Sequence, residues 1–189
     1  MRRQDLEQYV GATVDDLIGP GLRLLFVGIN PGLWTAATGA HFAHPGNRFY
    51  PALAGAGITD HRIDAADGYK PSDRDHLIER GVGITNLVTR ATAKADALDR
   101  QELREGAERL RRHIEQWQPK VVAVVGITAY RTAFAKPKAK AGRQDDPLGS
   151  AGLWVLGNPS GLNAHETAAS LAAAYRQPAV EAGIVTPLN

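Results

Sequence analysis

Residues 22–29 read LRLLFVGI and lie between two turn sequences, Gly19-Pro20-Gly21 before them and Asn30-Pro31-Gly32 after them. A short, continuous apolar run bounded by turns is typical of a strand that is buried on both faces. Such strands belong to parallel sheets whose two faces are covered by helices. Three further runs have a similar profile and are predicted as strands: residues 82–88 (VGITNLV), 120–126 (KVVAVVG) and 153–156 (LWVL).

Helical patterns lie between these runs. Asp99 and Glu102 have the spacing of a capping box, extended here to an aspartate cap. Apolar residues then recur at helical spacing and predict a helix with one buried stripe, formed by Leu103, Ala107, Leu110 and Ile114. Asn163 and Glu166 repeat the capping spacing before a helix that Pro178 is expected to end.

Strands and helices alternate along the chain, which favours parallel pairing and right-handed crossovers. The expected fold is α/β, a three-layer α/β/α sandwich around a short, mainly parallel four-stranded sheet. The 189 residues fit one domain at roughly 100–200 residues per domain, with a core from about residue 13 to 177 and short tails. Residues 136–152 are polar and contain Pro and Gly, which predicts a mobile loop.

The chain contains no cysteine, which excludes disulfides, a thiolate nucleophile, cysteine-bound zinc and iron–sulfur clusters. No metal-ligand spacing, phosphate-binding glycine loop or dinucleotide-binding motif is found, so neither a metal nor a cofactor is expected. No run of about 18 apolar residues is present, and the N-terminal MRRQDLEQYV lacks the apolar region of a secretory signal. We therefore expect no membrane association and a cytoplasmic protein.

The net charge of +2 hides an uneven distribution. Residues 100–143 contain 11 Lys and Arg and 4 Asp and Glu, whereas the segments on either side carry more acidic than basic residues. A basic segment in a nearly neutral protein indicates a polyanionic partner. The alternative interpretation is a solvated helix face followed by a lysine-rich loop.

Two predicted strands are followed by related sequences, GINPG at residues 28–32 and GNPSGLN at residues 157–163. Ligands bind beyond the carboxyl ends of the strands in an open parallel sheet, and glycines there let a ligand approach the backbone. Asn-Pro and Pro-Gly also occur in ordinary turns. Two such loops at one edge of the sheet nevertheless favour a binding site.

The segment that follows the first strand, residues 33–49, contains one aromatic residue and two histidines of interest. Phe42 could stack on a planar base, although a lone phenylalanine is more often part of the core. Near it lies His41, and His44 precedes Pro45. The latter pair is either a helix-entry turn or the source of a catalytic base.

Four segments, taken in order, resemble the mismatch-specific uracil/thymine-DNA glycosylase family, and more closely its bacterial mismatch uracil-DNA glycosylase branch: GINPG at 28–32, TGAHFAHPGNRF at 38–49, GITNLV at 83–88 and NPSGL at 158–162. The resemblance extends from about Leu17 to about Tyr175. It implies an α/β/α sandwich and hydrolysis of the N-glycosidic bond of a flipped-out base, which leaves an abasic site. The absence of cysteine excludes the iron–sulfur branches of the wider superfamily.

In this resemblance Asn30 matches the catalytic asparagine. A side-chain amide orients water but cannot remove its proton, which suffices where the glycosidic bond breaks first. Phe42 matches the aromatic residue that stacks on the extruded base. Backbone amides near Ile29 and Phe42 would bind the edge of uracil and stabilise the departing anion. Neither strand-end motif contains lysine, so a Schiff-base lyase step is not expected.

The second motif is expected to bind the DNA around the base. Asn158, together with Ser160, would hold the flipped nucleotide and its phosphate. Gly161, Leu162 and Asn163 match the segment that enters the duplex. Leu162 would be the apolar wedge that fills the gap left by the base, and Gly161 would lie near the opposite guanine.

Three positions depart from the family pattern or extend it. Ala164 stands where bacterial relatives often carry an arginine that binds DNA, so the hold on the opposite strand would be weaker. Trp34 is bulky where relatives have small polar residues. It either faces the core or lines the pocket, where it would exclude thymine. Asp96, in the loop RATAKAD, is either a solvated surface carboxylate or a second catalytic group that activates water.

The expected function is that of a monofunctional DNA glycosylase of base excision repair. It would remove uracil, preferably mispaired with guanine, and by extension bulky etheno or other modified pyrimidines. Its partner would be double-stranded DNA containing uracil or mispaired bases, bound by a monomer that works at the bacterial nucleoid. The alternative is a nucleic-acid or nucleobase binding protein with little turnover. A small-molecule nucleotide hydrolase would need an acidic metal cluster that the sequence lacks.

Overall fold

A computed structural model describes residues 1–188 of the chain. Its centre is a five-stranded sheet with the strand order β2-β1-β3-β5-β4. Four of the strands are parallel, namely β1 (Leu24–Gly28), β2 (Val82–Asn86), β3 (Val121–Val125) and β5 (Gly152–Leu156). The short β4 (Gly142–Arg143) lies antiparallel to β5 at one edge of the sheet.

The prediction of an α/β fold with a mainly parallel sheet is confirmed, but the predicted number of strands was wrong, since the sheet has five strands rather than four. The additional strand, β4, is only two residues long and lies within the polar segment 136–152. Its residues are not buried, so no apolar pattern marks it in the sequence. It is held by its pairing with Trp154 and Val155 of β5.

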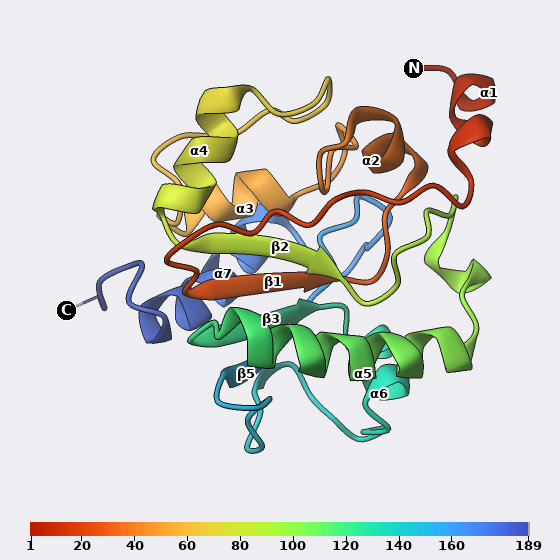
Figure 1. Cartoon of the computed structure of the whole chain (residues 1–189). Coiled ribbons are helices and arrows are strands. Elements are labelled where there is room, and N and C mark those ends of the chain that lie inside the picture. The colour runs from red at the N-terminus through yellow and green to blue at the C-terminus, as the bar shows by residue number, and fades with distance from the viewer. Residues whose placement is uncertain (189) are drawn as a thin grey trace.

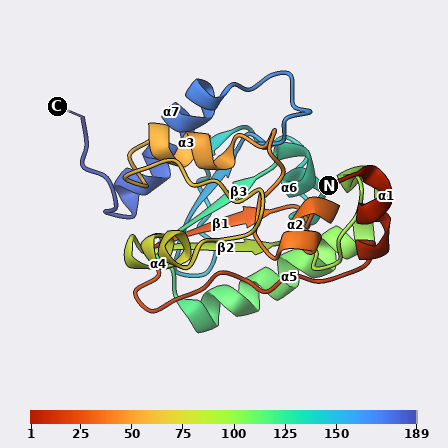
Figure 2. The same ribbon diagram turned by 90° about the horizontal axis from the view of Figure 1, so that it is seen from above.

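Helices cover both faces of the sheet, as Figure 1 shows. One face is covered by α5 (Arg100–Trp117) and α6 (Ile127–Ala133), and the other by α3 (Phe49–Gly55), α4 (Pro71–Glu79) and α7 (Ala168–Glu181). The view from above shows α3 and α7 side by side (Figure 2). The remaining helical segments are α1 (Arg3–Leu6), η1 (Glu7–Tyr9), α2 (Leu33–Thr38) and η2 (Ala95–Ala97).

The core consists of two clusters, one on each face of the sheet. Along β1, Leu24 and Phe26 belong to the cluster beneath α3 and α7, whereas Leu25 and Val27 belong to the cluster beneath α5 and α6. All four side chains are fully buried. Because successive residues of a strand point to opposite faces, a strand that is covered on both sides needs a continuous apolar run. This requirement explains the LRLLFVGI sequence.

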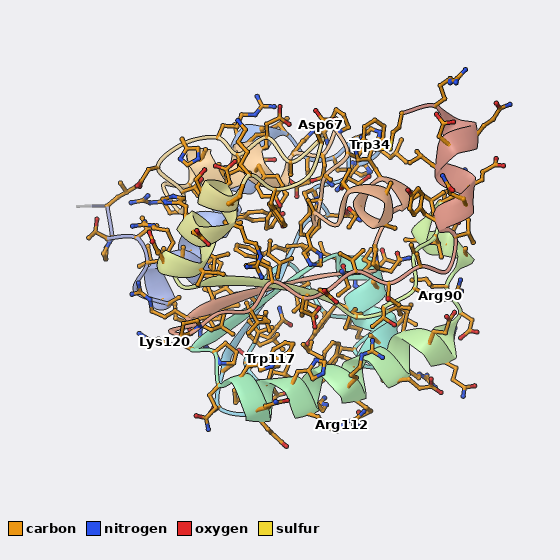
Figure 3. All side chains as sticks on the ribbon, turned by 45° about the horizontal axis from the view of Figure 1, so that its top comes forward. Trp34, Asp67, Arg90, Arg112, Trp117 and Lys120 are labelled. Carbon is orange, nitrogen blue, oxygen red and sulfur yellow. The ribbon has the colours of Figure 1, made fainter. Side chains whose placement is uncertain are left out.

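The predicted start of α5 is confirmed. Asp99 is its N-cap and accepts a hydrogen bond from the backbone N–H of Glu102, whose carboxylate accepts one from the N–H of Asp99. The predicted apolar stripe of this helix is buried at Leu103, Ala107, Leu110 and Ile114. Figure 3 shows α5 below the sheet, with Arg112 on the outer side of the helix and Arg90 near its beginning.

The bounds predicted for α7 were wrong at both ends. Its cap is Thr167, which forms a capping box with Ser170, because the Asn163 side chain binds the Asn158 carbonyl and the His165 N–H instead. Pro178 lies inside the helix and does not end it. The fixed φ of proline suits a helix, and its missing N–H removes one hydrogen bond near the helix end. In the described residues, no helix is long and apolar enough to cross a membrane.

Candidate active site

Three asparagines lie at the carboxyl ends of parallel strands. Asn86 is the last residue of β2 and is in register with Gly28, the last residue of β1. Asn30 follows β1, and Asn158 follows β5. Because parallel strands place their carboxyl ends at one edge of a sheet, this edge is the preferred place for a ligand. The two Asn-Pro loops therefore lie at the same edge, as the sequence predicted.

Asn30 is held by the loop that follows β2. Its Nδ2 donates hydrogen bonds to the Arg90 carbonyl at 3.0 Å and to the Thr92 hydroxyl at 2.7 Å. The Thr92 hydroxyl in turn donates to the Lys94 carbonyl at 2.8 Å, so its oxygen acts as the acceptor for Asn30. Both partners accept hydrogen bonds, so the Asn30 atom that contacts them must be the amide nitrogen, which donates, and not the amide oxygen.

The oxygen of the Asn30 amide remains available. No residue in the described range 1–188 donates a hydrogen bond to Oδ1, and no buried side-chain oxygen or nitrogen in that range lacks a partner. The oxygen of this half-buried residue is therefore reached by solvent. An amide whose nitrogen is fixed and whose oxygen faces water can accept a hydrogen bond from a water molecule and direct its lone pair.

The sequence interpretation missed Arg90 and Thr92. The guanidinium of Arg90 binds both carboxylate oxygens of Glu102 at the start of α5, which ties the loop to the helix. These hydrogen bonds, together with the Asp99 N–H, lower the pKa of Glu102 to about 2. In the RATAKAD loop the sequence indicated only Asp96 as a candidate. A buried hydroxyl such as that of Thr92, 5% exposed, has no recognisable local pattern.

Phe42 lies over the end of β1. Its ring stacks on Phe49, with centroids 4.1 Å apart and an angle of 24° between the planes. A Cβ placed on Gly28 would lie 3.2 Å from Cζ of Phe42 and 2.5 Å from Oδ1 of Asn86. A larger residue than glycine would therefore displace the Asn86 amide and crowd the Phe42 ring. The Phe42 ring and the Asn86 amide occupy the space directly above the same glycine.

The backbone near this ring offers two hydrogen-bond donors. The N–H groups of Ile29 and Phe42 donate to no residue in the described part of the chain. Phe42 has a φ of 53°, in the left-handed region that is unfavourable for a bulky side chain. Uncommitted backbone donors and a conformation of this kind are typical of binding and catalytic loops. The side chain of Ile29 packs towards Gly126.

The loop after β5 is shaped by its own side chains. Oδ1 of Asn158 accepts a hydrogen bond from the Ser160 N–H at 3.0 Å, and Nδ2 of Asn163 donates to the Asn158 carbonyl at 3.0 Å. The Leu162 side chain is 88% exposed at the tip of this loop. A single exposed apolar side chain is common on protein surfaces, so the exposure of Leu162 is compatible with the predicted wedge and does not by itself identify a contact surface.

Arg48 joins this loop to the Phe42 loop, and the sequence interpretation missed it. Its guanidinium donates to the carbonyls of Ser160 at 3.2 Å and Asn163 at 2.9 Å, and its N–H donates to the Pro159 carbonyl. Gly161 packs so closely on this loop that a Cβ there would lie 2.6 Å from the carbonyl oxygen of residue 46. The two loops therefore form one surface.

Within residues 1–188, the other candidate residues form no hydrogen bond with Asn30, Phe42 or Asn158. Asp96 is exposed and lies in η2, within the loop that binds Asn30. Trp34 packs against the core cluster, and its indole N–H donates to the Ala66 carbonyl at 2.8 Å. Nδ1 of the exposed His44 accepts a hydrogen bond from the N–H of Gly46, which supports the interpretation of His44-Pro45 as a turn.

The basic segment lies partly on another surface. A groove of about 620 Å³ is lined by α5, by Phe134 and by the neighbouring alanines. The charged side chains in this groove are Arg104, Arg109, Arg111, Arg112, Glu105 and Glu108. Figure 3 places Arg112 on the side of the sheet away from Trp34. The groove is therefore separate from the strand-end residues and is mixed in charge. Within residues 1–188, no group of three or more carboxylates or histidines is placed to hold a metal ion.

Comparison with known proteins agrees with this fold. A family model described as "Uracil DNA glycosylase superfamily" matches residues 16–182. The fold is also similar to the solution NMR structure of "a putative Uracil DNA glycosylase from Methanosarcina acetivorans", with a TM-score of 0.60 and 12% sequence identity. That similarity covers 89% of this chain and 98% of the other. At this level of identity it concerns the fold.

Proposed function

The chain belongs to the uracil DNA glycosylase superfamily, and on this premise we propose that it is a monofunctional DNA glycosylase of base excision repair. It hydrolyses the N-glycosidic bond of uracil in double-stranded DNA, preferably where uracil is mispaired with guanine. The observation that carries the proposal is the fixed amide of Asn30, whose oxygen faces solvent at the end of β1, the strand end over which the Phe42 ring also lies.

The reaction requires the base to leave the duplex, because its glycosidic bond is inaccessible in the stack. The flipped uracil lies on the open side of the Phe42 ring, whose other face is stacked on Phe49. The N–H groups of Ile29 and Phe42 bind a carbonyl oxygen of the base. As the bond between C1′ and the base nitrogen breaks, negative charge grows on the base, and donors already in place stabilise it without reorganisation.

Water then adds to the sugar cation. Oδ1 of Asn30 accepts a hydrogen bond from this water and directs its lone pair towards C1′. The amide cannot take up the proton, so the step depends on the bond to the base having broken first. The water supplies oxygen to C1′, and its proton passes to solvent or to the departing uracil anion. The products are uracil and an abasic site.

A general base would accelerate this step, and we assign that role to Asp96. Its support is its position in the loop whose Arg90 carbonyl and Thr92 hydroxyl hold Asn30. Asp96→Asn removes the base while keeping the size of the side chain, so excision should slow. An unchanged rate in this variant would leave Asp96 as a solvated surface residue.

The DNA around the lesion is bound by the loop after β5. Leu162 enters the duplex in place of the flipped base, and Gly161 and Asn163 lie beside the opposite guanine. Asn158 and Ser160 hold the backbone of the flipped nucleotide. We expect the preference for mispaired uracil on energetic grounds, because a U·G pair costs less to open than a normal pair. A monomer with a single domain suffices for these contacts, and no cofactor is needed.

Substrate range follows from the surroundings of Phe42. Trp34 is bound through its indole nitrogen to the Ala66 carbonyl and packs on the core. These contacts favour the core interpretation of Trp34 over that of a pocket wall that excludes larger bases, and etheno-modified pyrimidines are proposed as further substrates. The alternative function, a nucleobase-binding protein with little turnover, retains every contact described above and lacks the chemical step.

The test is to incubate the protein with duplexes that contain single U·G, U·A or T·G pairs, and with single-stranded uracil DNA, and to measure alkali-labile sites. We expect cleavage that is strongest for U·G. Asn30→Ala should abolish or severely reduce cleavage while DNA binding persists, and DNA affinity should fall with salt as phosphate contacts release counterions. Binding without cleavage of any substrate would favour the alternative function.

A further inference from the structure

His41 precedes Phe42 and is 2% exposed. Each of its polar groups has a partner. Its backbone N–H donates to the Tyr69 hydroxyl at 3.2 Å, and its carbonyl accepts from the Tyr50 hydroxyl at 2.7 Å. Its ring nitrogens contact the Asp15 carbonyl at 2.9 Å, through Nε2, and Nδ2 of Asn86 at 3.4 Å, through Nδ1. The residue before the stacking ring is thus fixed at four points.

These contacts assign the protonation of the ring. A carbonyl oxygen only accepts hydrogen bonds, so Nε2 must carry a proton to bind Asp15. In the neutral ring Nδ1 is then an acceptor, and its partner on Asn86 must be the donating Nδ2. Burial lowers the pKa of His41 below its usual value, which keeps the ring in this neutral form. The histidine therefore determines which way the Asn86 amide faces.

The consequence concerns the edge of the bound base. With Nδ2 held by His41, Oδ1 of Asn86 lies over Gly28, beside Phe42. It accepts no hydrogen bond from residues 1–188 and is reached by solvent. A base stacked on Phe42 meets a hydrogen-bond acceptor at this point. Uracil presents a ring N–H between its two carbonyls and matches this acceptor, whereas cytosine presents a ring nitrogen with a lone pair and is repelled.

We propose that His41 is a positioning residue that locks the Asn86 amide in the orientation that accepts the ring N–H of uracil and rejects cytosine. The inference rests on the proposed function for its substrate. Selection against cytosine is a requirement for an enzyme that acts opposite guanine, because the normal partner of guanine is cytosine. A free amide could turn over and present its nitrogen, which would match cytosine equally well.

The two tyrosines explain why the lock is rigid. Tyr50 donates to the His41 carbonyl, so the hydrogen bond of 2.8 Å between the two hydroxyls must be donated by Tyr69. Burial raises the pKa of Tyr69 to about 12 and that of Tyr50 well above its usual value. Both hydroxyls thus stay protonated, and the backbone at His41 cannot move without breaking a buried hydrogen bond.

The experiment is a double-mutant cycle of His41→Gln, Asn86→Ala and the variant carrying both changes. Glutamine retains a donor for the Asp15 carbonyl but places no acceptor at the position of Nδ1. Binding is measured to duplexes that contain 2′-fluoro-2′-deoxyuridine or 2′-fluoro-2′-deoxycytidine opposite guanine, in which the fluorine suppresses cleavage. Uracil excision is measured in parallel under single-turnover conditions. His113→Gln is the matched control, because His113 stacks on Trp117 of α5.

We expect the wild-type protein to prefer the uracil duplex, and His41→Gln to reduce this preference and the excision rate roughly tenfold, the value of about one hydrogen bond. In the Asn86→Ala background the same change should have no further effect, because coupled residues are non-additive. His113→Gln should leave both quantities unchanged. The cycle also separates this role from a purely structural one. If His41→Gln acted only by destabilising the fold, it would lower binding and excision in the wild-type background and in the Asn86→Ala background alike.

Three results would overturn the inference: no preference for uracil in the wild type, an unchanged preference in His41→Gln, or an equal loss in the Asn86→Ala background. The proposed function fails separately, when the wild-type protein binds the uracil duplex in preference to the cytosine duplex but cleaves no uracil. In that case the binding measurements still decide whether His41 acts through Asn86.

Discussion

The Asn30 amide and the Thr92 hydroxyl are joined by a hydrogen bond of 2.7 Å, although the two residues are separated by most of the first half of the chain. Thr92 also donates to the Lys94 carbonyl, so its oxygen is a committed acceptor. The Asn30 amide therefore cannot turn over without placing its oxygen against another oxygen. Thr92 thus decides which atom of the Asn30 amide faces solvent.

Replacing Thr92 by valine keeps the shape of the side chain and removes the hydroxyl. Asn30 then retains its hydrogen bond to the Arg90 carbonyl but loses the other of the two hydrogen bonds that orient its amide. We expect the single-turnover rate of uracil excision to fall about tenfold to a hundredfold, with little change in DNA affinity, since one oriented hydrogen bond is worth roughly 1–3 kcal/mol at such a site. Thr92→Ser, which keeps the hydroxyl, should retain most of the rate. Equal rates for both variants would contradict this role.

The fold was largely predictable because its strands are buried on both faces. Residues 24–28 and 121–125 form uninterrupted apolar runs, and the capping box at Asp99 marks the start of α5 within its own sequence. The strand β4 and the start of α7 were not predicted, because no buried apolar pattern marks either of them. A glycine and an arginine at the edge of the sheet form no apolar pattern. The side chain of Asn163 has several possible backbone partners, between which only the tertiary structure decides.

The candidate site was predictable where a residue lies in a motif and not where it acts through space. Asn30 and Phe42 were identified in conspicuous sequences that follow a strand. His41, Arg48 and Thr92 reach their partners across many residues of sequence, as in the bond from Arg48 to the Asn163 carbonyl. Nothing in a local pattern states which carbonyl a buried side chain will meet. The partners of these residues are therefore seen only in the folded structure.

Leu162 is 88% exposed and supports no part of the folded core. Leu162→Ala should therefore change the free energy of unfolding by no more than about 0.5 kcal/mol, as is usual for surface substitutions. If the side chain fills the gap left by the flipped base, excision from U·G duplexes should fall roughly tenfold or more. Excision from single-stranded uracil DNA, where no gap exists, should be unaffected. A parallel loss on both substrates would remove the wedge role.

Arg48 uses its guanidinium within the protein, where it binds the Ser160 and Asn163 carbonyls. Arg48→Met keeps the length of the side chain but releases the loop that carries Leu162. Duplex affinity should weaken by about fivefold to tenfold, because binding must then order this loop. The slope of affinity against salt should stay the same, since the lost contacts are not with phosphate. A shallower slope in titrations monitored by fluorescence anisotropy would instead assign Arg48 to the DNA backbone.

Glu102 links the acid stability of the protein to the loop that holds Asn30. The Arg90 guanidinium and the Asp99 N–H lower its pKa from an ordinary value near 4.5 to about 2. A group whose pKa is lower in the folded state stabilises that state above its unfolded pKa, and this contribution is lost as the pH falls towards the folded value.

Glu102→Gln can preserve the capping geometry, because glutamine also serves at this position, but it lacks the charge that binds Arg90. Urea titrations should show the wild type as the more stable protein from pH 7 to about 4.5, with a difference that shrinks as the pH falls towards about 2. The matched control is Glu105→Gln, on the exposed side of the same helix, where Glu105 binds the neutral Gln101 side chain. The difference in stability between this variant and the wild type should not shrink in the same way. A wild-type advantage that persists undiminished down to pH 3 would mean that the pair with Arg90 does not set the pKa of Glu102.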